Sequence, residues 1–235
     1  AEGLYFTGGG GTGTNFVVDS NSRISLSNND GNTGNTVFGY NAFSNAGTVL
    51  GNVGADYNVY IGHNVADSNP TTSEKNIGIG YSALSGITTG DSNVAVGYSA
   101  GYTLTTSSNN VLIGDAAGEV IAAGQTTTDG TIAIGKSALG ALTTGARNLA
   151  VGYTAGDAMT DEDDVVLIGY NAGGALTHTN SNGTVAIGSG ALATLESGRG
   201  NVAIGYQALD AEDDGDFNTA VGYQALTAQT GVSGH

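Results

Sequence analysis

The chain has 235 residues and a formal net charge of −16, with five Lys plus Arg residues, no cysteine and no tryptophan. The lack of cysteine excludes a disulfide framework, a thiolate zinc site and a thiol nucleophile. The acidic charge argues against nucleic acid and anionic membranes as partners, and without a run of 18 apolar residues we predict no membrane insertion.

Residues 1–34 contain two short strand-like runs but no regular repeat. The runs Phe16-Val-Val-Asp and Arg23-Ile-Ser-Leu-Ser flank a turn rich in Ser and Asn, which is typical of two short strands. We expect residues 1–34 to form a lead-in segment that caps the repeats, because an open sheet end exposes unpaired N–H and C=O groups. Residues 231–235 are expected to form a frayed end.

Glycine recurs with a regular spacing through residues 35–230. The interval between these marker glycines is most often 17 residues, and three coils form a longer repeat. The marker glycines are Gly39, Gly62, Gly80, Gly97, Gly114, Gly135, Gly152, Gly169, Gly188, Gly205 and Gly222. A fixed period with one strand-like phrase per repeat is typical of a solenoid. The sequence therefore predicts an all-β solenoid domain over residues 35–230, with about 17 residues per coil and about 11 coils.

β-Branched residues stand one and three positions before most marker glycines, as Val185 and Ile187 do before Gly188. Because side chains two apart share one face of a strand, we predict that these two columns fill the inside of each coil. The column between them is apolar, and we predict that it faces outward and is covered by another copy of the chain. Its members are Ala95, Leu112, Ala133, Ala150, Leu167, Ala186, Ala203 and Ala220.

Asparagine recurs four positions before the marker glycine. The members of this column are Asn76, Asn93, Asn110, Asn148, Asn201 and Asn218. Stacked amide side chains can form hydrogen bonds from one coil to the next, so we interpret the column as a structural ladder and not as a ligand site. The marker glycine itself is expected to supply a positive φ or room for a close backbone approach.

Tyrosine follows the marker glycine in many coils. The tyrosines of this column are Tyr81, Tyr98, Tyr153, Tyr170, Tyr206 and Tyr223. A ladder of rings on a fibre can contact sugar rings. The alternative is that the rings stack on one another or close the seams between subunits.

Two acidic runs, 161–164 and 210–216, offer oxygen ligands to a hard cation such as Ca²⁺. Neither run fits a known calcium-loop motif, so we interpret both as solvated loops and predict no cofactor beyond adventitious Ca²⁺ or other cations. His63, His178 and His235 are isolated in the sequence and are expected at the surface. Because no nucleophile–base pair or cleft can be argued from the residues, we predict no enzymatic activity.

The phrases Asn201-Val-Ala-Ile-Gly-Tyr-Gln-Ala-Leu and Asn218-Thr-Ala-Val-Gly-Tyr-Gln-Ala-Leu resemble the repeats of tailed-phage fibres and spikes. They are also similar to the head repeats of trimeric autotransporter adhesins. The resemblance covers about residues 35–230. It implies a homotrimer of left-handed β-rolls about a three-fold axis, in which the predicted outward column forms the trimer seam.

Three functions are open on this basis. The first is a rigid trimeric segment of a phage tail fibre or spike, which joins other virion components and presents or contributes to contact with host cell-surface glycans. The second is the head of a bacterial surface adhesin, and the third is a fibre-borne glycan hydrolase. The first two imply an extracellular location, on the virion or on the bacterial surface.

Overall fold

The computed structural model describes residues 34–43, 54–68, 70–121, 128–177, 181–231 and 234, together with the backbone of residues 16–18 and 24–26. The described residues form an all-β parallel solenoid with roughly 17 residues per turn. No α-helix occurs in these ranges, so none of them provides a helix long and apolar enough to cross a bilayer. The predicted solenoid and its repeat length are thus confirmed.

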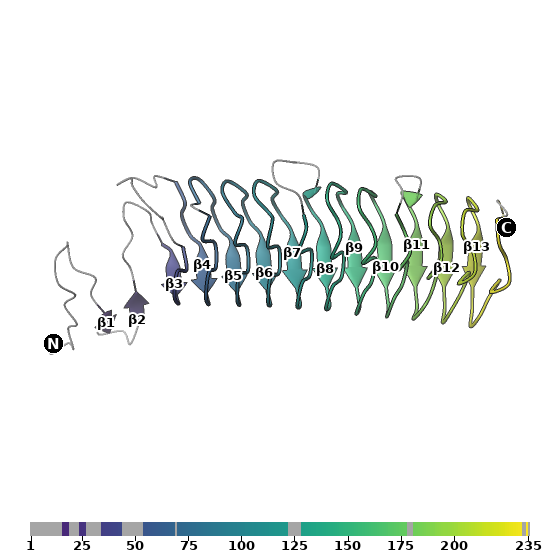
Figure 1. The fold of residues 1–235 in the computed structure, drawn as a ribbon, viewed down its shortest axis with the longest axis horizontal. Helices are drawn as coiled ribbons and strands as arrows, with labels where there is room; N and C mark the ends of the chain where they lie inside the picture. The colour runs from purple at the N-terminus through teal and green to yellow at the C-terminus, as the bar shows by residue number, and fades with distance from the viewer. Residues whose placement is uncertain are drawn as a thin grey trace.

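Each turn contributes one three-residue strand to a single sheet, and the strands follow chain order along the rod (Figure 1). The strands are β3 (Thr36–Phe38), β4 (Val59–Ile61), β5 (Ile77–Ile79), β6 (Val94–Val96), β7 (Val111–Ile113), β8 (Ile132–Ile134), β9 (Leu149–Val151), β10 (Val166–Ile168), β11 (Val185–Ile187), β12 (Val202–Ile204) and β13 (Thr219–Val221). All neighbouring pairs are parallel and in register, so equivalent residues of successive repeats lie side by side. For example, Ala150 pairs with Ala133 and Leu167.

The two strand-like runs of the lead-in segment are β1 (Phe16–Val18) and β2 (Ile24–Leu26), which pair antiparallel. The rest of the lead-in up to residue 33 lies outside the described residues. The same holds for three of the five residues at 231–235 and for His178.

The predicted orientation of the strand faces is wrong. Within the single chain, the residues assigned to an outward seam are at most 2% exposed, and they line the inside of the coil. They are Ala95, Leu112, Ala133, Ala150, Leu167, Ala186, Ala203 and Ala220. The β-branched columns on either side therefore point outward.

The space inside the coil explains this reversal. The residue seven positions after the marker glycine enters the core as a large buried side chain, as Leu104, Leu142 and Leu176 do. Because these side chains already fill most of a thin interior, the strand opposite them contributes only a small residue in most coils. Close packing then favours alanine over valine or isoleucine at the inward position.

Where the inward strand residue is leucine, the neighbouring turns carry glycine. A Cβ on Gly156 would lie 2.6 Å from Leu167 Cδ1, and a Cβ on Gly173 would lie 2.7 Å from Leu167 Cδ2. In another coil the exchange is reversed, since buried Leu139 stands at the glycine position and Ala133 lies on the strand. The equivalent residues one longer repeat earlier are Leu112, Gly101 and Gly118. The three-coil repeat therefore reflects a volume exchange within the core.

The marker glycines bring the backbones of successive coils together. Their φ angles lie between +132° and +146°, a region that side-chain-bearing residues rarely adopt. A Cβ on Gly152 would also lie 2.6 Å from the carbonyl carbon of Gly169 in the next coil. Both features exclude a side chain at this position.

The asparagine column forms a buried ladder along the rod. Asn93 Oδ1 accepts hydrogen bonds from the backbone N–H of Asn110 at 3.0 Å and from its Nδ2 at 3.1 Å. Asn93 Nδ2 in turn donates to the backbone carbonyl of Ser107 at 2.9 Å, which ties the strand to the far side of its own coil. The same strand-to-strand bond reaches Asn76, Thr131, Val165 and Asn218. Asparagine thus satisfies backbone groups that a thin core would otherwise leave unpaired.

A second ladder, which the sequence reasoning missed, runs six positions before the marker glycine. Asp163 Oδ1 accepts a hydrogen bond from the backbone N–H of Ala146 at 2.7 Å, and the N–H of Asp163 donates to Asn182 Oδ1 at 2.8 Å. Other acceptors of this ladder are Asp91, Ser108, Asp129 and Asp216. Part of the acidic excess is therefore structural, because these carboxylates connect one coil to the next.

Candidate functional site

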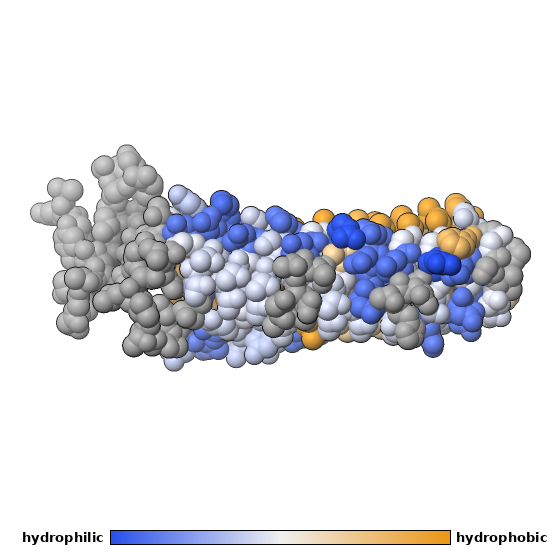
Figure 2. Space-filling view, turned by 90° about the horizontal axis from the view of Figure 1, so that it is seen from above, coloured by the Kyte–Doolittle hydropathy of each residue, from blue (hydrophilic) through white to orange (hydrophobic). Residues whose placement is uncertain are grey.

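The outward face of the sheet is apolar along the rod. It consists of the first and third residues of each strand, and these are half-buried in most coils, while Ile113 and Ile204 are each 37% exposed. Polar residues cover most of the flank in Figure 2, and hydrophobic residues gather mainly along one edge. We call the outward columns of β4–β12 the assembly face. A continuous apolar strip of this kind is typical of a surface that another molecule covers.

Six of the tyrosines after the marker glycines stack in three pairs, and these six rings are 46–74% exposed. Ring centroids are 5.2 Å apart for Tyr81 and Tyr98, and 5.7 Å apart for Tyr153 and Tyr170. A third pair, Tyr206 and Tyr223, stacks at 5.3 Å. The rings therefore contact one another, and their outer surfaces stay accessible.

The aromatic ladder extends further towards the N-terminus than the tyrosine pairs, because it includes His63. His63 lies between Tyr40 and Tyr81, with centroid distances of 4.9 and 5.3 Å. Sequence reasoning treated His63 as an isolated surface residue, although its place directly after Gly62 puts it in the tyrosine column. Towards the middle of the rod the column changes to Asp115 and Lys136, whose charged groups lie 3.7 Å apart.

A polar groove of about 330 Å³ lies beside this aromatic ladder. Its lining consists of Asn64, Asp67, Tyr81, Ser82, Ser85, Tyr98, Ser99, Tyr102 and Glu119. Tyrosine rings whose edges and hydroxyl groups are accessible, next to hydroxyl, amide and carboxylate groups, can contact a sugar ring and form hydrogen bonds with its hydroxyl groups. The groove takes residues from several coils, so no single repeat predicts it.

The two acidic runs have different structures. In the first run, Glu162 is buried and its Oε2 accepts hydrogen bonds from the backbone N–H groups of Thr160 and Asp161 at 2.8 and 3.0 Å. Asp164 pairs with Arg147 at 2.7 Å, and this hydrogen bond lowers the pKa of the Asp164 carboxyl. The first run therefore engages Asp164 and one oxygen of Glu162 within the fold, while Glu162 Oε1 is buried with no hydrogen-bond partner among the described residues.

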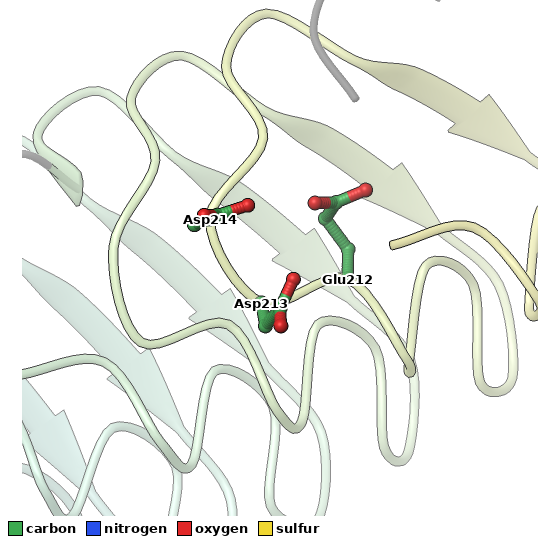
Figure 3. Close-up of side chains that lie close together, drawn as sticks. All are labelled: Glu212, Asp213 and Asp214. Carbon is green, nitrogen blue, oxygen red and sulfur yellow. The ribbon is translucent and has the colours of Figure 1, made fainter. Parts of the chain in front are cut away.

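The second run brings three carboxylates together. Glu212, Asp213 and Asp214 lie in the loop between β12 and β13, and their ligand oxygens are all within 4.8 Å of one another. Glu212 is fully buried, whereas Asp213 and Asp214 are exposed. Figure 3 shows the three carboxylates directed towards a common region. Among the described residues this is the one group of three or more potential metal ligands.

Comparisons of the chain with protein-family models, curated proteins and solved structures found no significant match.

Proposed function

We propose that the chain is a structural and adhesive segment of a trimeric fibre, of the kind found in phage tail fibres or spikes. The observation that carries the proposal is the assembly face, an apolar strip of Val and Ile side chains on the outside of the rod. We infer that its occupants are two further copies of the same chain. Each copy offers the same strip with the same coil spacing, so three parallel rods match along their whole length.

The sequence resemblance supports this arrangement, but the surface that forms the seam is revised. The buried alanine column takes no part in it, and the Val and Ile columns on either side replace it. In this proposal the segment is extracellular, connects other fibre or virion components and has no enzymatic activity. An adhesin head on the bacterial surface would use the same assembly face.

The trimer predicts a mass three times the chain's 23.1 kDa in sedimentation or light scattering. Leu149→Glu, on the outward face of β9, is expected to reduce the mass to that of one chain with unchanged β-sheet circular dichroism. The substitution would place unpaired carboxylates in an apolar interface, which costs several kcal/mol per ion.

A matched control is Ser108→Asp. It adds the same charge at a ladder position where Asp91 and Asp129 stand in neighbouring coils, so it should keep the trimer mass. A monomeric native protein, or a trimeric Leu149→Glu variant, would contradict the proposal.

We propose further that the groove beside the aromatic ladder contributes the contact with cell-surface glycans. Its three tyrosines and adjacent polar groups suit one or two sugar units. In saturation-transfer NMR with a panel of hexoses, hexosamines and their short oligomers, at least one sugar should receive signal from the native protein. Tyr98→Ala should reduce this transfer at least several-fold, whereas Tyr170→Ala, on a stacked ring outside the groove, should preserve it. Absence of transfer to every sugar would reject this role.

A further inference from the structure

The position of Glu212 within its coil is unusual. In the coils of Gly80 to Gly188, the residue seven positions after the marker glycine is a buried aliphatic or thioether side chain, as Met159, Leu176 and Leu195 are. Glu212 occupies this core position and is also fully buried. A carboxylate at an apolar core position is costly unless its oxygens are satisfied by donors or by a cation.

The protein satisfies one oxygen of Glu212 and leaves the other open. Glu212 Oε1 accepts hydrogen bonds from the backbone N–H groups of Gly215 and Gly231 at 2.7 and 2.8 Å. Glu212 Oε2 is buried and has no hydrogen-bond partner among the described residues. The two donors therefore fix the carboxyl group and leave Oε2 available as a ligand.

Two further carboxylates face the same place. Asp213 and Asp214 each bring one carboxylate oxygen within 4.8 Å of a carboxylate oxygen of Glu212, and none of the ion pairs formed by described residues involves any of the three. The backbone of Asp213 is held in place, because its carbonyl accepts hydrogen bonds from the N–H groups of Glu196 and Ser197. Three negative charges thus converge without a cationic side chain.

We propose that Glu212, Asp213 and Asp214 form a Ca²⁺ site in the loop between β12 and β13. Ca²⁺ binds carboxylate oxygens at about 2.3–2.6 Å, so ligand oxygens on opposite sides of the ion are about 4.8 Å apart, and it accepts water as its remaining ligands. The three ligand oxygens lie within this span of one another. The donor set is all oxygen, which favours a hard cation over Zn²⁺. Water reaches the site through the exposed Asp213 and Asp214.

The test is calorimetric titration of the whole chain, freed of metal with a chelator, with CaCl₂. We expect one Ca²⁺ bound per chain and, at a hundredfold excess over Kd, a midpoint of thermal unfolding raised by about 5–10 °C. Mg²⁺ at the same concentration should bind more weakly, since it requires a smaller octahedral site. Absence of Ca²⁺ binding to the native protein would overturn the proposal.

Two variants and one control assign the binding to these residues. Glu212→Leu restores the residue type of Leu176 and Leu195, so it should fold without Ca²⁺ and lose the binding. Asp214→Asn tests an exposed ligand that the fold does not need, and should weaken binding at least tenfold. Asp161→Asn removes a charge from the other acidic run and should leave binding unchanged. Equal effects of Asp161→Asn and Asp214→Asn would show general charge screening and reject the site, as would undiminished binding in Glu212→Leu.

Discussion

Replacing Gly152 with alanine is expected to unfold the middle of the rod. The new methyl group would lie 2.6 Å from the carbonyl carbon of Gly169, a backbone atom that cannot move without separating β9 from β10. Gly152 also has a φ of +146°, where an alanine is strained by about 1–3 kcal/mol before the clash is counted. We expect a total loss of at least about 4 kcal/mol, measured by urea unfolding followed by circular dichroism.

Gly222→Ala separates the two causes. Gly222 has a similar φ of +133°, but it belongs to the last coil, and the nearest atom to its added Cβ is Ala225 Cβ at 4.0 Å. This variant should therefore show the backbone strain alone and lose much less stability. If the two variants were equally stable, close stacking of the coils would not be what requires glycine here.

Asn93→Ala is expected to cost about 3 kcal/mol or more in the free energy of unfolding. The substitution removes the acceptor of the buried Asn110 N–H and the donor to the Ser107 carbonyl. Each buried group left without a partner costs about 1–3 kcal/mol. Urea unfolding of the variant measures the sum.

Asn93→Thr is the matched comparison, because Thr131 and Thr184 occupy the same column and are fully buried. Thr184 Oγ1 donates to the carbonyl of Gly198 at 3.3 Å, so threonine replaces part of what asparagine provides. The threonine variant should lie between the native protein and the alanine variant. An alanine variant as stable as the native protein would show that the ladder is a by-product of stacking.

The repeat was predictable because it is periodic along the sequence and the fold is periodic along the rod. The interval between marker glycines predicted the strands and their register, and the polar column predicted where amides stack. These features depend on one coil and its neighbours, so a single aligned column contains the signal. Asn93, for example, forms its side-chain bonds within its own coil and with the two adjoining ones.

The orientation of the strands was not predictable from alternation alone. In a three-residue strand such as Leu149–Val151, alternation separates one residue from two but does not say which set faces the core. Both sets are apolar, so the usual difference between a polar, solvent-exposed face and an apolar, buried face is missing. The column containing Leu142 and Leu176 indicates which set faces the core. Its large side chains already fill most of the interior, so only the small residues of the strand fit opposite them.

The backbone conformation of the turn residues was even less predictable from the sequence. Lys75, Arg147 and Leu139 adopt φ values of 59°, 57° and 50°, a left-handed region that is uncommon for residues other than glycine. Their side chains do not favour it, so the conformation is imposed by the stacked coils. The acidic cluster shows the same limit, because the run 210–216 reads as a solvated loop unless the buried position of Glu212 is known.

The in-register pairing of β3–β13 also determines how the length of such a rod can change. Because the core contacts of Leu112 with Gly101 and Gly118 recur three coils later at Leu167 with Gly156 and Gly173, adding or removing a three-coil unit leaves its neighbours with equivalent contacts. The distance between whatever is attached at the two ends then changes in steps of about 14 Å, which is three strand spacings. Duplication of a stretch of gene is enough to lengthen such a spacer, and the core does not need to be redesigned.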